Sequence, residues 1–298
     1  MIIFLYALAI FGSSSAQNIE IQECLTCIAV NGTCFNVSHV LEFDAPFRNQ
    51  IVIREMGILR SENMLFYTFE PAIEVNEYSK IGFVYLEGQN VSGVIASDKL
   101  ILNFGTFDID QDNAMVYLGG SDGIFLLDIN ENKLSSYSSR GDTIWKLFFK
   151  NNVNFVKNDE KGIIVKRGDN FKTLLENIQV RNFVINKYDV VVFLNNSGLF
   201  AGKGDTVARL SQNPFFRGLN IDLDGVIYAW WIDGIYKVIV ERNVKDARIF
   251  KVATVPGIGA LAFDNDNNIM FTLEKGLRLA SMLIMENTPY DKRLKVHN

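Results

Sequence analysis

The sequence is conspicuously poor in histidine and in clustered basic residues. Its 298 residues include two histidines, His39 and His297, and no run of lysines or arginines. A Ser-His-Asp triad and a histidine-ligated metal both need imidazole groups, so we predict no catalytic residue, no metal site and no cofactor. The net charge of −5 offers no attraction for nucleic acid or for an anionic membrane surface, and neither is predicted as a partner.

No apolar run is long enough to cross a bilayer. The short apolar run 2–11 is followed by small residues at 13–16, as in a secretory signal peptide, so we predict a leader over residues 1–16. Asn-X-Ser/Thr sequons agree with export, and we predict N-glycosylation at Asn31, Asn36, Asn90 and Asn195. The predicted location is therefore extracellular.

Cysteine is equally scarce and is confined to one segment. The three cysteines are Cys24, Cys27 and Cys34. No second Cys-X-X-Cys pair completes a zinc or redox site, so a structural disulfide is the favoured interpretation. In an exported protein one disulfide would form and one thiol would remain or pair with another molecule; the sequence leaves the pairing open.

A glycine followed by apolar residues recurs along the chain, whereas no segment shows a helical period. The recurring glycines are Gly82, Gly123, Gly162, Gly198, Gly234 and Gly276, and successive ones are 41, 39, 36, 36 and 42 residues apart. A four-stranded blade repeats at about that period. The sequence therefore predicts an all-β fold, a six-bladed β-propeller of four-stranded antiparallel blades, with five or seven blades as alternatives.

The predicted domain organisation is a signal peptide over 1–16, a Cys-containing N-terminal segment over 17–38 and the propeller over 39–298. Residues 40–43 are predicted to close the ring against the last blade, with 293–296 as a further candidate strand. Two acidic stretches, at 108–113 and 264–268, resemble the start of a calcium loop but lack its later glycine and glutamate, so we predict hairpin turns there.

A cluster of cationic and aromatic residues is predicted at one mouth of the ring. The first strand of each blade lines the channel, and three of them begin with an arginine in similar register. Guanidinium groups bind carboxylates and stack on flat rings, so this mouth suits a flat, acidic small molecule. The alternative is that these are ordinary surface arginines. The predicted ligand-binding residues are Arg48, Trp145, Arg181, Arg217, Trp231 and Phe216.

The segment from Cys24 to Cys34, CLTCIAVNGTC, directly after a leader, resembles the start of the lepidopteran ommochrome-binding proteins. The chain length and the Phe-, Asn- and Asp-rich repeats are similar to that family as well. The resemblance implies a haemolymph protein that binds ommochromes, acidic phenoxazinone pigments, without converting them. The resemblance carries over no individual binding residue, because beyond the cysteine segment it rests on the overall character of the sequence and not on aligned residues.

Two other functions remain open. One is a calcium-dependent propeller hydrolase or lactonase, which hydrolysis of an ester or lactone in the presence of metal would reveal. The other is a secreted interaction propeller similar to the yellow and royal-jelly proteins, which a stable protein partner would reveal. A carrier of a coloured ligand, which is not an enzyme, is the favoured prediction; its oligomeric state is not predicted.

Overall fold

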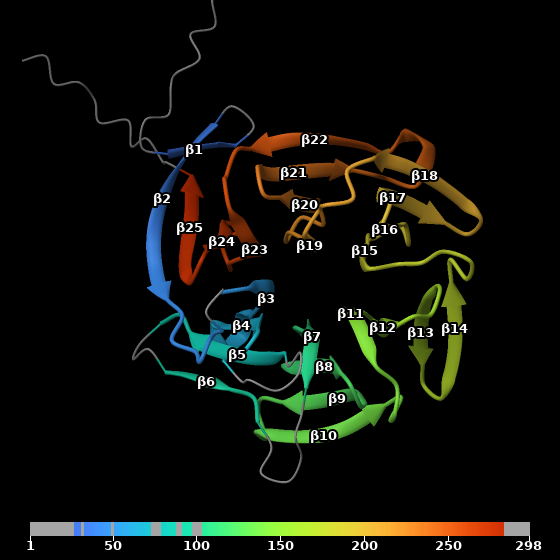
Figure 1. Ribbon diagram of the computed structural model, residues 1–298, viewed down its shortest axis with the longest axis horizontal. Coiled ribbons are helices and arrows are strands. Elements are labelled where there is room, and N and C mark those ends of the chain that lie inside the picture. Colours follow the sequence, from blue (N-terminus) through green and yellow to red (C-terminus); the bar gives the residue numbers. More distant parts are fainter. Residues whose placement is uncertain are drawn as a thin grey trace, which may run out of the picture.

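Each predicted repeat forms one antiparallel sheet, and the six sheets are arranged in a ring (Figure 1). We describe the protein from a computed structural model, over residues 27–30, 33–48, 51–72, 79–87, 91–96 and 103–282. The prediction of a six-bladed β-propeller is confirmed. No segment among these residues forms a helix of the length and apolarity that a membrane crossing needs.

In every blade the first strand of the repeat is innermost and the later strands follow outward. Blades 1 to 3 consist of β3 Ile53–Leu59, β4 Met64–Phe69, β5 Lys80–Tyr85 and β6 Ser92–Val94; β7 Phe104–Asp110, β8 Met115–Gly120, β9 Gly123–Asp128 and β10 Lys133–Ser138; and β11 Ile144–Lys150, β12 Asn152–Lys157, β13 Ile163–Arg167 and β14 Asn170–Leu174. Blades 4 and 5 consist of β15 Asn182–Ile185, β16 Val191–Asn195, β17 Gly198–Lys203 and β18 Thr206–Ser211; and β19 Gly218–Ile221, β20 Ile227–Trp231, β21 Gly234–Ile239 and β22 Arg248–Ala253.

Blade 6 joins the two ends of the described chain. Its inner strands are β23 Ile258–Phe263, β24 Ile269–Leu273 and β25 Gly276–Met282, and β2 Thr33–Glu42 then pairs antiparallel with β25. The predicted closing strand is thus confirmed, but it is longer than predicted and crosses the boundary proposed at residue 39. A fifth strand, β1 Cys27–Val30, lies outside it. The alternative strand 293–296 lies outside the described residues.

The cysteine prediction can be followed only in part, because Cys24 lies outside the described residues. In the β1–β2 ladder Cys27 is opposite Asn36 and Cys34 is opposite Ala29. Cys27 and Cys34 are therefore diagonal neighbours, a spacing of about 7–8 Å that exceeds the usual Cα separation of a disulfide. The disulfide stays a prediction. So does glycosylation at Asn36, which is exposed on β2, and at Asn195; Asn31 and Asn90 are outside the described residues.

The recurring glycine has a steric cause at the start of the third strand. Gly198 and Gly234 have φ values of 139° and 152°, and a Cβ on either would run into the carbonyl oxygen at the end of the fourth strand, of Ser211 and Ala253 respectively. Only glycine permits that approach. Gly276 does not show this feature, because in blade 6 the fourth strand comes from the other end of the chain.

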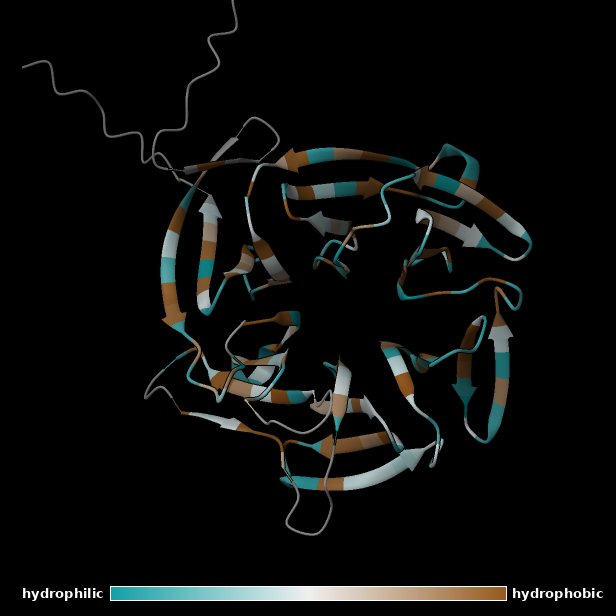
Figure 2. Cartoon of the chain, in the orientation of Figure 1, coloured by the Kyte–Doolittle hydropathy of each residue, from teal (hydrophilic) through white to brown (hydrophobic). Residues whose placement is uncertain are grey.

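The hydrophobic core is divided among the six interfaces between neighbouring blades. Middle strands such as β4 and β16 are apolar and buried along almost their whole length, because both faces of their sheets pack against neighbouring blades. The outermost strands mix polar and apolar residues (Figure 2). At the interface of blades 1 and 2, for example, Phe66 contacts Phe107 with their ring centroids 6.1 Å apart. This packing fixes the inner strands around the axis and thereby positions the site.

Candidate functional site

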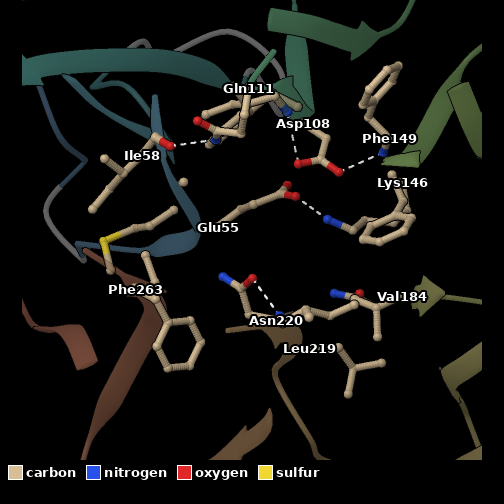
Figure 3. A pocket seen from close by; sticks show the side chains of 18 of the residues that line it. Glu55, Ile58, Asp108, Gln111, Lys146, Phe149, Val184, Leu219, Asn220 and Phe263 are labelled. Atoms are coloured by element: carbon tan, nitrogen blue, oxygen red, sulfur yellow. Dashed lines mark hydrogen bonds and ion pairs between the residues drawn. The ribbon is translucent and has the colours of Figure 1, made fainter. Parts of the chain in front are cut away.

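A cavity lies on the axis of the ring and is lined by residues of all six inner strands (Figure 3). Its volume is about 200 Å³. The inner strands all run in the same direction along the axis, since every blade has the same strand order. We call the end at which they begin the start end, and the opposite end, with the hairpins between first and second strands, the hairpin end.

The cavity extends toward the hairpin end. Arg60, Gln111 and Leu223 contribute to its wall, and all three belong to the connections that follow inner strands. At the other extreme, no lining residue precedes the beginning of its inner strand; Asn182, the first residue of β15, and Trp230, opposite the first residue of β19, are the nearest to the start end. The cavity is therefore asymmetric along the axis.

An ion pair crosses the channel. Glu55 of β3 and Lys146 of β11 belong to blades 1 and 3, which are not neighbours, and their carboxylate and ammonium groups are paired. Their side chains are only 18% and 11% exposed. Figure 3 shows them meeting between Asp108 and Asn220. A pair this deep removes two charges from water and holds blades 1 and 3 together across blade 2.

Asp108, on β7, connects blades 2 and 3 beside that pair. Its carboxylate accepts hydrogen bonds from the backbone N–H of Phe149 at 2.6 Å and of Ile109 at 2.9 Å. Burial raises the pKa of Asp108 to about 6, although both N–H donors and the Lys146 ammonium favour its charged form. The carboxyl thus titrates well above the ordinary aspartate range.

Asn220, on β19, has the equivalent position in blade 5. Its side chain donates to the carbonyl of Leu261 at 2.8 Å and accepts from the N–H of Ile221 at 2.8 Å. Asn182, on β15, also lines the cavity, and its buried Oδ1 has no hydrogen-bond partner among the described residues. A buried acceptor without a donor costs about 1–3 kcal/mol, so a guest with an N–H or O–H group would be favoured here.

Three cationic side chains line the cavity, and two of them are neutralised. Lys146 pairs with Glu55, and Arg54 pairs with Glu70. The guanidinium of Arg60 has no hydrogen-bond or ion-pair partner in the part of the chain that the structure describes. Aromatic residues also contribute atoms to the wall: Phe107, Phe148, Phe149, Trp230 and Phe263.

The six residues predicted from the sequence lie near the start end, and none of them lines the cavity. The Arg181 guanidinium donates to the carbonyls of Pro214 and Phe216, at 3.0 and 2.9 Å, in the segment that leads into blade 5. Burial lowers the pKa of Arg181. The Arg217 guanidinium donates to the Ile258 carbonyl of blade 6 at 2.7 Å.

Arg48 lies apart from these two arginines, in the connection between blades 6 and 1. Its Nε donates to the Pro71 carbonyl at 3.1 Å, and its Nη1 lies 3.7 Å from a carboxylate oxygen of Glu70. All three predicted arginines therefore already bind groups of the protein itself.

The predicted aromatic residues differ widely in accessibility. Trp145 is 49% exposed, whereas Phe216 is 3% exposed and packs edge-on against Tyr236 with ring centroids 5.2 Å apart. Trp231 instead contacts Phe215, which is 64% exposed, with ring centroids 5.3 Å apart and planes inclined at 30°. Trp231, which is half-buried, and the exposed Phe215 thus form an aromatic pair at the start end.

The sequence interpretation missed the axial residues Glu55, Asp108 and Lys146. Irregularities in strand pairing explain this for Glu55 and Lys146: the β3–β4 register shifts between Ile53 and Met56, and the β11–β12 register shifts between Ile144 and Lys146. Each shift interrupts the alternation of inward and outward side chains. A charged residue within an apolar first strand was the available signal.

The two stretches that resemble calcium loops are hairpin turns, as predicted. Asp264 Oδ1 accepts from the N–H groups of Asp266 and Asn268, at 3.0 and 2.7 Å. Asp110 is likewise bonded to the N–H groups of the next turn. Within the described ranges, no group of three or more His, Cys, Asp or Glu residues is placed to hold a metal ion.

Comparison with known proteins gives one informative sequence relative. The chain is 25% identical over 226 residues to the ommochrome-binding protein of Manduca sexta, which covers 72% of this chain and 78% of that protein. No family model matches the sequence.

Several solved structures share the fold. A putative gluconolactonase superposes with a TM-score of 0.57 at 8% identity, covering 83% of this chain and 92% of the other. The gluconolactonase XC5397 of Xanthomonas campestris gives 0.57 at 8% identity, over 85% and 91% of the two chains. A virginiamycin B lyase of Staphylococcus aureus gives 0.56 at 10%, over 84% and 90%. At these identities the similarity establishes the propeller fold alone.

Proposed function

We propose that this protein is a secreted carrier that binds a small acidic aromatic compound, an ommochrome-type pigment, on the axis of the propeller and releases it unchanged. The observation that carries the proposal is the similarity to the Manduca sexta ommochrome-binding protein, which extends over 226 residues and therefore over most of the ring. The axial cavity provides a place for the guest.

The composition of the cavity wall supports a ligand of this kind. It combines aromatic and aliphatic side chains with amide groups and with the unpaired guanidinium of Arg60. Ligand sites are commonly apolar with a few polar groups that fix orientation, and a guanidinium is suited to a carboxylate. The leader predicted over 1–16 and the four sequons support export, and the family resemblance adds haemolymph as the compartment.

Metal-dependent hydrolysis is the second candidate function, because gluconolactonases share the fold. Against it stands the pairing of the axial carboxylate of Glu55 with the Lys146 ammonium, which already supplies a positive charge at that carboxylate. Calcium prefers several carboxylate and carbonyl oxygens together, and a neighbouring ammonium opposes its binding.

The test is a titration of the purified full-length protein with xanthommatin, monitored by visible absorption. We expect a shifted pigment band that saturates at one equivalent and disappears when the protein is unfolded in urea. The same preparation is assayed for hydrolysis of a simple lactone with added calcium and with a chelator. An unchanged pigment spectrum at all protein concentrations contradicts the carrier function, and calcium-dependent turnover favours the hydrolase.

A further inference from the structure

The structure points to the hairpin end of the axial cavity as the mouth through which the guest enters, with Arg60 as the residue that binds its acidic group. This inference rests on the proposed function and goes beyond it, because it assigns an entrance and a recognition residue. It also differs from the prediction made from the sequence, which places both at the start end.

The first argument is the position of the cavity. Its wall includes residues of three hairpins at one end of the ring, and among them Leu223 is 42% exposed. Toward the start end, by contrast, the Glu55–Lys146 pair spans the channel near the beginning of the inner strands. A guest that entered from the start end would have to pass close to this buried ion pair, whereas one that entered from the hairpin end would reach the cavity without approaching it.

The second argument is charge. Arg60 is exposed at the hairpin end, and its guanidinium has no partner among the described residues, as shown above. An acidic guest can therefore gain a charge-assisted hydrogen bond there without displacing a carboxylate of the protein. At the start end the guanidinium groups of Arg181 and Arg217 already donate to backbone carbonyls.

The third argument is the rigidity of the backbone that carries Arg60. Its N–H donates to Oε1 of Gln111, on blade 2, at 3.0 Å, and its carbonyl accepts from Asn265, on blade 6, at 3.3 Å. Gln111 also donates to the carbonyl of Ile58 at 2.7 Å. The main chain of Arg60 is thus fixed by both neighbouring blades while the side chain stays available, an arrangement that lowers the entropic cost of binding.

A matched pair of variants tests which end is the mouth. Leu223→Glu and Phe215→Glu each replace an exposed hydrophobic residue with a carboxylate, the first at the hairpin end and the second at the start end. We expect Leu223→Glu to weaken xanthommatin binding at least about tenfold through like-charge repulsion, and Phe215→Glu to bind within twofold of the wild-type protein.

A second matched pair tests the role of Arg60. We expect Arg60→Gln to weaken binding about tenfold or more, since a hydrogen bond to a charged group is lost. Arg248→Gln removes an exposed arginine from the outer strand β22 and is expected to change nothing. Added salt should weaken the wild-type complex more than that of Arg60→Gln, because it screens the charge pair. Urea midpoints establish that every variant is folded.

The outcomes separate the inference from the proposed function. If the wild-type protein does not bind the pigment, the proposed function fails before any variant is compared. If it binds and either Leu223→Glu or Arg60→Gln binds equally well, or if Phe215→Glu is the variant that weakens binding, the inference is overturned and the carrier function stands.

Discussion

The two ends of the ring are fastened by different chemistry. At the start end, long cationic and aromatic side chains reach carbonyls of the next blade: Arg181 to Pro214 and Phe216, Arg217 to Ile258, and the Trp230 indole to Gly259 at 2.8 Å. At the hairpin end, short amide side chains of the turns connect neighbouring blades: Asn267 of blade 6, for example, accepts a hydrogen bond from the N–H of Leu223 of blade 5. The comparison teaches that arginines at strand starts can be structural. Among the cations of the cavity wall, it is Arg60, at the opposite end, whose guanidinium lacks a partner within the described residues.

The largest effect on stability should come from the Glu55–Lys146 ion pair, which lies between the two ends of the channel. Lys146→Met leaves Glu55 buried without its partner, so we expect the free energy of unfolding to fall by about 3 kcal/mol, measured by urea denaturation. The double variant Glu55→Gln, Lys146→Met removes both charges and should recover most of that loss. If the single variant is as stable as the wild-type protein, the pair does not hold the channel together.

A double substitution at the start end should have the next largest effect. Arg181→Ala with Arg217→Ala leaves three carbonyls of the next blades without donors, and we expect a loss of about 2 kcal/mol in unfolding free energy. Xanthommatin affinity should be unchanged in the folded fraction. A drop in affinity of tenfold or more would instead place the guest at the start end, as the sequence alone suggests.

The smallest effect concerns the pH dependence that Asp108 gives to the channel. Its pKa is about 6 in the folded protein against an ordinary value of 3.8, so the folded state holds the proton more tightly than the unfolded chain. Its stabilising contribution is therefore complete below about pH 4 and is lost as the pH rises through about 6.

The measurement is the difference in unfolding free energy between the wild-type protein and Asp108→Asn across this pH range. We expect that difference to shift against the wild-type protein by at most about 2 kcal/mol between pH 4 and pH 7, because solvent in the cavity screens the effect. Other titrating carboxylates are common to both proteins and cancel. Parallel pH profiles would show that Asp108 titrates normally.

The fold could be predicted because its causes are local and repeated. In blades 2 to 5 the third-strand glycine is required by a close carbonyl, and Asp and Asn in the hairpins are favoured by turn geometry, so both recur with the blade period. The fifth strand of blade 6 could not be predicted, because nothing in residues 27–30 distinguishes a strand that covers an edge from an irregular segment.

The site was less accessible to prediction, for two physical reasons. The register shifts near the starts of β3 and β11 change which residues face the axis, and a bulge leaves no reliable signature in residue types. The direction of a long side chain is also decided by tertiary contacts: Arg181 and Arg217 have the spacing of a ligand-binding set, yet both turn to the neighbouring blade. A cation without a partner can be recognised only from the three-dimensional structure, because tertiary contacts decide which groups the other cations bind.

The pairing of β2 with β25 has a consequence for how the chain is made. These two strands lie near opposite ends of the described sequence. During synthesis, blades 1 to 5 can therefore assemble before β25 exists, and β2 remains unpaired with it until then. A contact of such long sequence separation forms late. Closing the long loop costs conformational entropy, and this cost falls only when the chain between the two strands is already ordered. Until that moment the molecule is an open arc with two bare sheet edges, and this is the stage at which joining to another copy of itself would be the main hazard.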